Sequence, residues 1–464
     1  MNRKKLSVGK LAAAIVAGGA AMVAAQEAHA VPAFARQLGV SCAACHTVEP
    51  QLTSFGRQFK SLAYTFNSGS NNTISYEQNG EKRLAIDKIP PIALMMIADE
   101  SWSGKANNAS GTPNPSADFP GQYSLFYAGR AGTDLGVFSQ LTWDPTTNSV
   151  GIDNTDVRYA KETPVGNGNL VWGLDVNNAP GVGDLWQDTP IWGFPFYSPV
   201  QGNAGNGGPI GTVLGNVTLQ ANSVGAGGYV WYNNTYYAQV MLYRGMVPGS
   251  TVNTLNGTIS NVAPYWRLAY SHEGGVNSWE IGTFGIYGKS YAVGMTSGPQ
   301  AKYLDTALDG QYEHVATNYS YTIRASYIHE SLKVPNAMVP NSTTASGNTT
   351  GSVNQYQING QYYWHRKYGV VGQYFGVSGS TNANLWGDSG ANTPVAAPAL
   401  LSNGGGTSSI NGSPDTSGEI LQVNYLPWIN TKFGVQYVAF NKFDGSSTNA
   451  SYNNTLSVFM WLMM

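Results

Sequence analysis

The sequence predicts an all-β protein, a transmembrane β-barrel of the outer-membrane type with about sixteen strands, preceded by a small α-helical segment. Three observations predict this fold. Segments of about ten residues alternate between polar and apolar side chains. Only 11% of residues are charged, and no apolar run beyond residue 30 is long enough for a spanning helix. A long chain of this composition favours crossing a membrane with paired strands.

The first 30 residues predict a secretory signal peptide. A basic start, MNRKK, precedes the apolar residues 11–25, and Ala28-His29-Ala30 provides the small side chains that signal peptidase requires. A membrane anchor is the alternative, but the apolar stretch is short and rich in alanine. The leader holds four of the 24 basic and one of the 26 acidic residues, which leaves 20 and 25. This mildly acidic balance gives no indication of a nucleic-acid partner.

The clearest strand signal lies at residues 354–365, NQYQINGQYYWH. One face collects polar side chains and one tyrosine: Gln355, Gln357, Asn359, Gln361 and Tyr363. The other face is apolar and aromatic: Tyr356, Ile358, Tyr362 and Trp364. This pattern predicts a strand with water on one side and lipid on the other. A soluble β-sandwich would explain the alternation, but not the low charge or the Tyr and Trp residues at strand ends.

Similar segments recur along the chain. They lie at residues 122–130, 134–143, 154–160, 170–178, 235–244, 265–272, 278–288, 319–330, 368–377, 419–427, 431–440 and 455–464, with weaker candidates near 91–101, 228–233 and 300–313. Counted back from the C-terminus, connections alternate between long (443–453, 379–418) and tight (426–430, 365–369). This alternation is typical of barrels with long external loops and short periplasmic turns, and the predicted barrel covers residues 89–464.

The only two cysteines of the chain, Cys42 and Cys45, lie three residues apart, and His46 follows at once. In an exported protein such a pair can form a disulfide, a redox-active pair, half of a zinc site or a haem attachment site. A zinc site needs further ligands nearby, and a thioredoxin-like site gives the histidine no role. C-x-x-C-H is the attachment sequence of c-type haem, with the histidine as proximal ligand of the iron. We therefore expect one covalent haem c.

Around the cysteines, residues 31–66 predict a small, mostly helical cytochrome segment, and we assign residues 31–88 to this domain. Apolar side chains at helix-like spacings can line the haem there: Phe34, Leu38, Phe55, Phe59 and Leu62. A segment of this size is too small to be stable alone, so we expect the barrel to shelter it.

The second axial ligand of the haem iron is the open position. Met95 and Met96 lie in the expected first strand, where alternation directs Met95 to the lumen and Met96 to lipid. Because methionine raises the potential of a haem, Met95 is the candidate distal ligand, and packing against the haem edge is its alternative. The other candidates fit ordinary strand or loop positions better: His272, His314, His329 and His365.

Several stretches together resemble one known family. They are PAFARQ, SCAACH and FGRQFK near the N-terminus, DNTDVRYAK and GDLWQDTPIWGFPF in the middle, and NNTLSVFMWLMM at the end. They resemble the fused cytochrome-porins, outer-membrane monohaem cytochromes c of iron-oxidising bacteria, over essentially the whole chain after the leader. The resemblance places Cys42 and Cys45 at the thioether positions and His46 at the proximal position. The terminal methionines depart from the aromatic residue with which barrels often end.

The resemblance also implies an activity. It implies oxidation of extracellular Fe(II) at the cell surface and transfer of the electron through the barrel-held haem to a small periplasmic cytochrome c or cupredoxin. It does not indicate which residues bind Fe(II), and we find no catalytic group beyond the haem. A porin-like channel with the haem as plug or sensor, and outward electron transfer to an external acceptor, remain the alternatives.

The expected external loops at residues 201–228, 331–353 and 379–418 contain very few Asp or Glu residues. Such loops have little charge to lose as the pH falls through about 4. Exposed porin loops often contain small polar residues in any case, and it is the resemblance to iron-oxidising bacteria that implies an acidic habitat.

Overall fold

The computed structural model describes residues 32–66, 73–104, 114–144, 148–190, 196–197, 211–215, 219, 223–245, 258–292, 295–339, 347–386 and 412–464. The predicted signal peptide lies outside the described residues. None of the helices in these ranges is long and apolar enough to cross a membrane.

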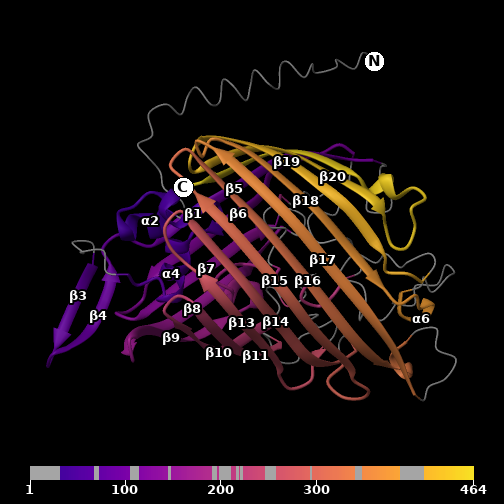
Figure 1. Ribbon diagram of the computed structural model, residues 1–464, viewed down its shortest axis with the longest axis horizontal. Coiled ribbons are helices and arrows are strands. Elements are labelled where there is room, and N and C mark those ends of the chain that lie inside the picture. Colours follow the sequence, from indigo (N-terminus) through magenta and orange to yellow (C-terminus); the bar gives the residue numbers. More distant parts are fainter. Residues whose placement is uncertain are drawn as a thin grey trace, which may run out of the picture.

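A closed antiparallel barrel forms most of the molecule (Figure 1). Its strands are β5 Ile92–Ser103, β6 Ser116–Arg130, β7 Leu135–Asp144, β8 Ser149–Val165, β9 Gly168–Asn177, β10 Ser223–Tyr232, β11 Tyr236–Gly245, β12 Thr258–Ile259, β13 Ala263–His272, β14 Asn277–Tyr291, β15 Ala301–Val315, β16 Tyr319–Pro335, β17 Asn348–Trp364, β18 Tyr368–Gly379, β19 Thr416–Trp428, β20 Thr431–Lys442 and β21 Thr455–Met463. The two-residue β12 only extends the pairing of β14, and β11 pairs directly with β13, so sixteen strands form the wall.

The barrel closes where β21 pairs with β5, with Met463 opposite Met95 and Thr455 opposite Ser103. Closure leaves no unpaired edge in the wall, as a membrane crossing requires. The predicted fold class is confirmed, and each of the sixteen predicted strand segments corresponds to one strand of the wall.

Side chains alternate between the two faces of the wall. In β17, Gln355, Asn359 and Gln361 are buried inside, whereas Ile358 and Tyr362 are exposed outside, as the sequence predicted. The outer face exposes a band of aliphatic side chains that includes Leu174, Val240, Leu268, Ile281, Leu308, Ile323, Val370, Leu421 and Val435. Such a band fits hydrocarbon and not water, so the chain is a porin-like barrel of the outer membrane.

Short turns join the strands at one end of the barrel. They cover residues 131–134, 166–167, 233–235, 273–276, 316–318, 365–367 and 429–430. The chain enters β5 and leaves β21 at this end, which is the periplasmic end of such barrels. The predicted loop at 331–353 is shorter than expected, because β16 continues to Pro335 and β17 already begins at Asn348. Most of the other two predicted loops lies outside the described residues.

The segment before the barrel combines helices with short strands. Its elements are α2 Pro32–Leu38, α3 Cys42–Cys45, β1 His46–Val48, β2 Gln51–Leu52 and α4 Ser54–Ser61. The predicted helices are present, and a two-stranded sheet of β1 and β2 follows the cysteines directly. The Thr53 hydroxyl caps α4 by accepting from the Gly56 amide at 3.2 Å. A Cβ on Gly56 would lie 2.3 Å from the Cys45 carbonyl oxygen, so this glycine lets α4 pack against the cysteine turn.

A hairpin of β3 Thr73–Gln78 and β4 Glu81–Asp87 links this segment to the barrel. The sequence analysis did not predict it. It projects away from the wall in Figure 1, and the predicted boundary between residues 88 and 89 falls between β4 and β5.

The connection between β9 and β10 turns into the lumen. It contains the short helix α5 Pro180–Gly183, and residues 184–189 continue from it, all of them buried or half-buried. Three further short elements belong to other connections: η1 Asn336–Met338, α6 Ala383–Trp386 and η2 Ala450–Asn453. We call the described part of the β9–β10 connection, residues 178–190, 196–197, 211–215 and 219, the lumenal insert.

Candidate functional site

The predicted haem attachment residues lie on one helical turn. Cys42 is the first residue of α3 and Cys45 is the last, and neither thiol forms a disulfide. The chain becomes extended at His46 (φ −128°, ψ 138°), which begins β1 and pairs with Leu52 of β2. This arrangement keeps both thiols and the imidazole within five consecutive residues, as covalent haem attachment requires.

The surroundings of His46 fit an iron ligand. Its Nδ1 lies 3.3 Å from the Gln51 carbonyl oxygen, which fixes the ring and leaves Nε2 for a metal. Burial lowers the pKa of His46, although Glu49 opposes this effect, so the neutral form that binds metals is favoured. Burial, reinforced by Cys42, raises the pKa of the Cys45 thiol to about 12.

Two buried side chains close to His46 have polar atoms without partners. Within the described part of the chain, the Thr47 hydroxyl and both polar atoms of the Gln51 side chain have no hydrogen-bond partner. Buried polar atoms of this kind are normally satisfied. A covalently attached haem fits the donor set of two thiols and an imidazole. Its propionates are acceptors of the kind that the Thr47 hydroxyl and the Gln51 amide nitrogen lack.

Aromatic side chains pack next to the cysteine turn. The Phe34 ring lies 5.1 Å from Phe59 and 4.9 Å from Tyr64, and this cluster includes Leu38 and Cys45. Of the predicted haem-lining residues, Phe34, Leu38 and Phe59 come together here. Phe55 is 38% exposed, and Leu62 packs instead against a cluster on the barrel wall.

Buried polar contacts fix residues 32–66, which we call the N-terminal segment, to the barrel. The Arg57 guanidinium of α4 pairs with Glu273, in the turn between β13 and β14, at 2.8 Å, and with Glu313 of β15 at 2.9 Å. Burial alone would lower the pKa of Arg57, but the two carboxylates outweigh it and raise the pKa. Both partners lie near the short-turn end, so α4 sits in the periplasmic mouth of the barrel.

Further contacts surround this ion pair. Lys60 donates to the carbonyl oxygens of Val182 and Asp184 in the lumenal insert at 2.5 and 2.9 Å. Burial, with a contribution from nearby Arg158, lowers the pKa of Lys60 to about 8. The Tyr64 hydroxyl donates to Asp156 of β8 at 2.5 Å. The segment is therefore held from several sides of the wall and by the insert.

Met95 faces the lumen, as alternation predicted, and is 4% exposed. It packs in a cluster that contains Ala33 of α2, Tyr197 of the insert and Phe459 of β21. Phe34 packs against both this cluster and the cluster of Cys45. Met95 thus lies on the same side of the lumen as the N-terminal segment, and its ligation of iron stays a prediction.

The four candidate histidines lie elsewhere. His314 and His329 are on the outer face, where each Nδ1 contacts an asparagine side chain at 2.7 Å. His272 is exposed and stacks on Trp279. His365 is exposed in the turn between β17 and β18. None of these positions places a ring inside the lumen.

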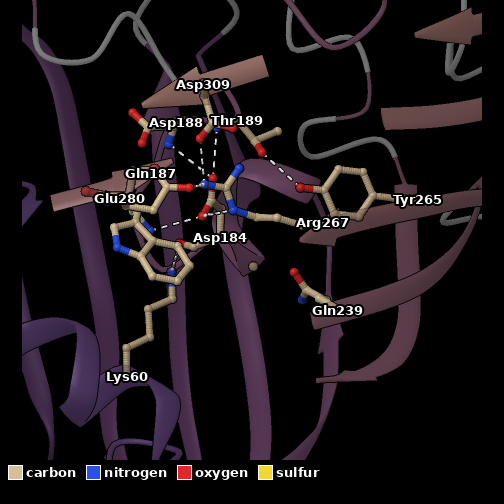
Figure 2. A network of polar contacts seen from close by, with 12 residues as sticks. Lys60, Asp184, Gln187, Asp188, Thr189, Gln239, Tyr265, Arg267, Glu280 and Asp309 are labelled. Atoms are coloured by element: carbon tan, nitrogen blue, oxygen red, sulfur yellow. Dashed lines mark hydrogen bonds and ion pairs between the residues drawn. The ribbon is translucent and has the colours of Figure 1, made fainter. Parts of the chain in front are cut away.

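The lumenal insert brings a second group of functional side chains together (Figure 2). Arg267 of β13 pairs with Asp184 of the insert at 3.0 Å, with Glu280 of β14 at 2.9 Å and with Asp309 of β15 at 2.6 Å. Beside it, Arg324 of β16 pairs with Asp188 of the insert at 2.7 Å. This network was not predicted from the sequence, although the charged residues at inward positions of β13–β16 were the available signal.

The network also contacts the N-terminal segment. The Trp186 indole nitrogen donates to Glu273 at 3.0 Å, and Glu273 is the partner of Arg57. Arg267 lies over the Trp186 ring at 5.3 Å. The insert thus connects the carboxylates of the lumen to the helix that packs on the cysteine turn.

No protein-family model matches the sequence, and no curated protein matches it either. Among solved structures, the chain is similar to OmpF of Salmonella typhi (14% identity, TM-score 0.46), over 84% of this chain and 100% of that one. It is also similar to the outer-membrane protein OmpT of Vibrio cholerae (11%, TM-score 0.43, 84% and 100%). A third is the anion-selective porin from Comamonas acidovorans (12%, TM-score 0.44, 80% and 99%). No functional residue is carried over from these proteins.

Proposed function

We propose that this chain is an outer-membrane c-type cytochrome that takes single electrons from extracellular Fe(II) and passes them to a periplasmic carrier. The observation that carries the proposal is the C-x-x-C-H turn on a segment that buried contacts fix inside the mouth of a closed barrel. The haem would supply the one-electron ferric–ferrous couple. Each turnover converts Fe(II) to Fe(III) and reduces the periplasmic carrier by one electron.

The chain's own residues would have distinct tasks. Cys42 and Cys45 hold the haem covalently, and His46, oriented by the Gln51 carbonyl, provides the proximal nitrogen. Arg57 keeps this segment at the short-turn end, where a small cytochrome c or cupredoxin in the periplasm can approach it. The lumen carries more buried carboxylates than cations in the described residues around Arg267, which favours a cationic substrate over an anionic one.

The second candidate function is a porin-like channel with the haem as plug or sensor, and the closed sixteen-strand barrel favours it. The two functions differ in what crosses the membrane. The proposal expects no stable ion conductance from the purified protein in a planar bilayer, because the described insert and the cytochrome segment contact several sides of the lumen. Sustained open-channel conductance of the haem-loaded protein would favour the channel instead.

The direction of electron flow is tested by the haem potential. A potentiometric titration of the purified protein should give a high, positive midpoint, since the donor Fe(II) is a weak reductant at acid pH. A strongly negative midpoint would contradict the proposal and favour outward electron transfer to an external acceptor.

A further inference from the structure

Three buried carboxylates of the lumenal network meet at one point. Asp188 comes from the insert, Glu280 from β14 and Asp309 from β15, and an oxygen of each lies within 4.8 Å of the others. Their side chains are almost fully shielded from solvent, with residue exposures of 4%, 1% and 7%. Burying like charges this closely is unfavourable unless a proton or a cation compensates them.

The arginines satisfy only one oxygen of each carboxylate. Asp188 Oδ1 faces Arg324, while Glu280 Oε1 and Asp309 Oδ2 face Arg267. Within the described part of the chain, the remaining oxygens, Asp188 Oδ2, Glu280 Oε2 and Asp309 Oδ1, have no hydrogen-bond partner. Three buried carboxylates from three different elements, each with one oxygen that accepts no hydrogen bond in the described residues, are the kind of ligand set that a bound cation needs.

A glycine also lies directly beside two of these carboxylates. A Cβ added to Gly282 of β14 would lie 2.2 Å from Glu280 Oε1 and 2.8 Å from Asp309 Oδ1. No side chain larger than hydrogen fits beside the two carboxylates without displacing them. The glycine therefore keeps the cluster compact.

The count of charged groups around the cluster also favours a bound cation. Around this point two guanidinium groups, Arg267 and Arg324, face four carboxylates, because Asp184 also pairs with Arg267. Lys60, another cation that contacts the insert, donates to backbone carbonyls and not to these carboxylates. The deficit of two positive charges equals the charge of one divalent cation.

We infer that Asp188, Glu280 and Asp309 form a binding site for one divalent metal cation. A set of three carboxylates and no nitrogen or sulfur ligand suits divalent cations that prefer oxygen ligands, such as Mg²⁺, Ca²⁺ and Mn²⁺. Fe²⁺ is a borderline cation that also binds carboxylate oxygens. The cation would tie the insert to the wall of the barrel, since Asp188 is the only one of the three ligands on the insert.

Identifying Fe(II) as the physiological occupant rests on the proposed function, whereas the site itself does not. Trp186, two residues before Asp188, contacts Glu273, and Glu273 pairs with Arg57 of α4. A cation in this site would therefore lie a few side-chain contacts from the cysteine turn, on the route by which an electron would reach the haem.

The test uses Mn²⁺, which binds oxygen ligands and has a strong electron paramagnetic resonance signal when free in solution. The purified full-length protein in detergent is titrated with Mn²⁺ at neutral pH. We expect one saturable site in the wild type and at least about tenfold weaker binding in Asp309→Asn and Glu280→Gln, which are close in shape to the native side chains.

Asp305→Asn is the matched control. Asp305 is a buried, inward carboxylate of the same strand that accepts from the Leu214 amide of the insert at 2.8 Å, but it lies outside the cluster of three. We expect its Mn²⁺ affinity to equal that of the wild type. Each variant is checked for a folded barrel by its heat-dependent mobility on a detergent gel.

Two results would overturn the inference. One is the absence of saturable Mn²⁺ binding to the wild type, which needs no variant to fold. The other is equal affinity in the wild type, Asp309→Asn and Glu280→Gln. Haem staining of the same samples reports separately on the proposed function, because loss of haem leaves the Mn²⁺ titration interpretable.

Discussion

The barrel wall and the segments inside it are built on different principles. The wall is joined by continuous antiparallel pairing and presents aliphatic side chains such as Ile281 and Leu308 outward. The N-terminal segment and the lumenal insert are held instead by individual buried ionic contacts, with Arg57, Arg267 and Arg324 as their centres. A buried charge without its partner is costly. Single substitutions at these contacts should therefore release the N-terminal segment or the insert from the lumen while the wall stays folded.

The largest effect is expected at the attachment turn. Cys42→Ala or Cys45→Ala removes a thiol that would form a thioether and should abolish or strongly reduce covalent haem, while the barrel still folds. His46→Ala should keep haem attached but change its low-spin spectrum. Haem staining of a denaturing gel and the visible spectrum measure both. Staining at the wild-type level in both cysteine variants would refute covalent attachment at this turn.

The next largest effect is expected on the docking of residues 32–66 in the barrel. Arg57→Ala leaves Glu273 and Glu313 buried without their cation and should destabilise the docked segment by about 3–5 kcal/mol. Limited proteolysis should then cleave residues 32–66 in the variant while the barrel stays resistant.

Arg83→Ala is the control for this prediction, because Arg83 pairs with Glu81 at 3.3 Å on the exposed hairpin. Exposed pairs contribute about 0–1 kcal/mol, so protection of the segment should not change. Equal protection in Arg57→Ala and the wild type would show that the ion pair does not hold the segment.

The stability of the docked segment should also depend on pH, because Lys60 titrates at a different pH when the segment is docked. Its pKa of about 8 in the docked state is below the ordinary value of 10.5, so between these values the undocked segment binds more protons. Docking should be unaffected below about pH 7 and become more stable as the pH rises from about 8 to 10, by up to about 3 kcal/mol. Protease protection measured across this range should show the rise in the wild type.

Lys60→Met removes the titrating group and should abolish that rise. The measurement stops near pH 10, because the pKa of Tyr64, raised by burial and by Asp156, opposes the trend at higher pH. A pH profile that is the same in the wild type and Lys60→Met would contradict the assignment to this lysine.

The smallest effect is expected at the wall itself. Met95→Ala should lower the haem potential, on the order of 100 mV if the thioether ligates the iron, since axial ligands account for much of the range of haem potentials. Met96→Ala, its neighbour on the outer face, is the control and should leave the potential unchanged. Small, equal shifts in both variants would exclude Met95 as a ligand.

The difference between the wall and the segments inside it also explains which features the sequence could predict. Alternation depends on neighbours along the chain, so it located all sixteen strands and placed Met95 inside. Strand lengths were less predictable, because β17 begins with Asn348, Thr349 and Thr350, whose polar side chains carry no alternation. The hairpin of β3 and β4 was missed for a related reason, since it is exposed on nearly all sides.

The contacts inside the lumen could not be predicted from local patterns. Arg57 meets Glu313, 256 residues away in sequence, and Arg324 meets Asp188 across 136 residues. The C-x-x-C-H motif was visible because its chemistry needs adjacent residues. The carboxylates of Asp188, Glu280 and Asp309 come from separate elements, so only the closed barrel and its insert bring them together.

The most direct test of the account is a stopped-flow mixture of the purified, ferric protein with excess Fe(II) at acid pH under anaerobic conditions. The account predicts that the haem bands change to the ferrous spectrum, and that Cys42→Ala protein, prepared in the same way, shows no such change. A haem that is present but stays ferric in excess Fe(II) would contradict the central claim that this barrel takes electrons from iron.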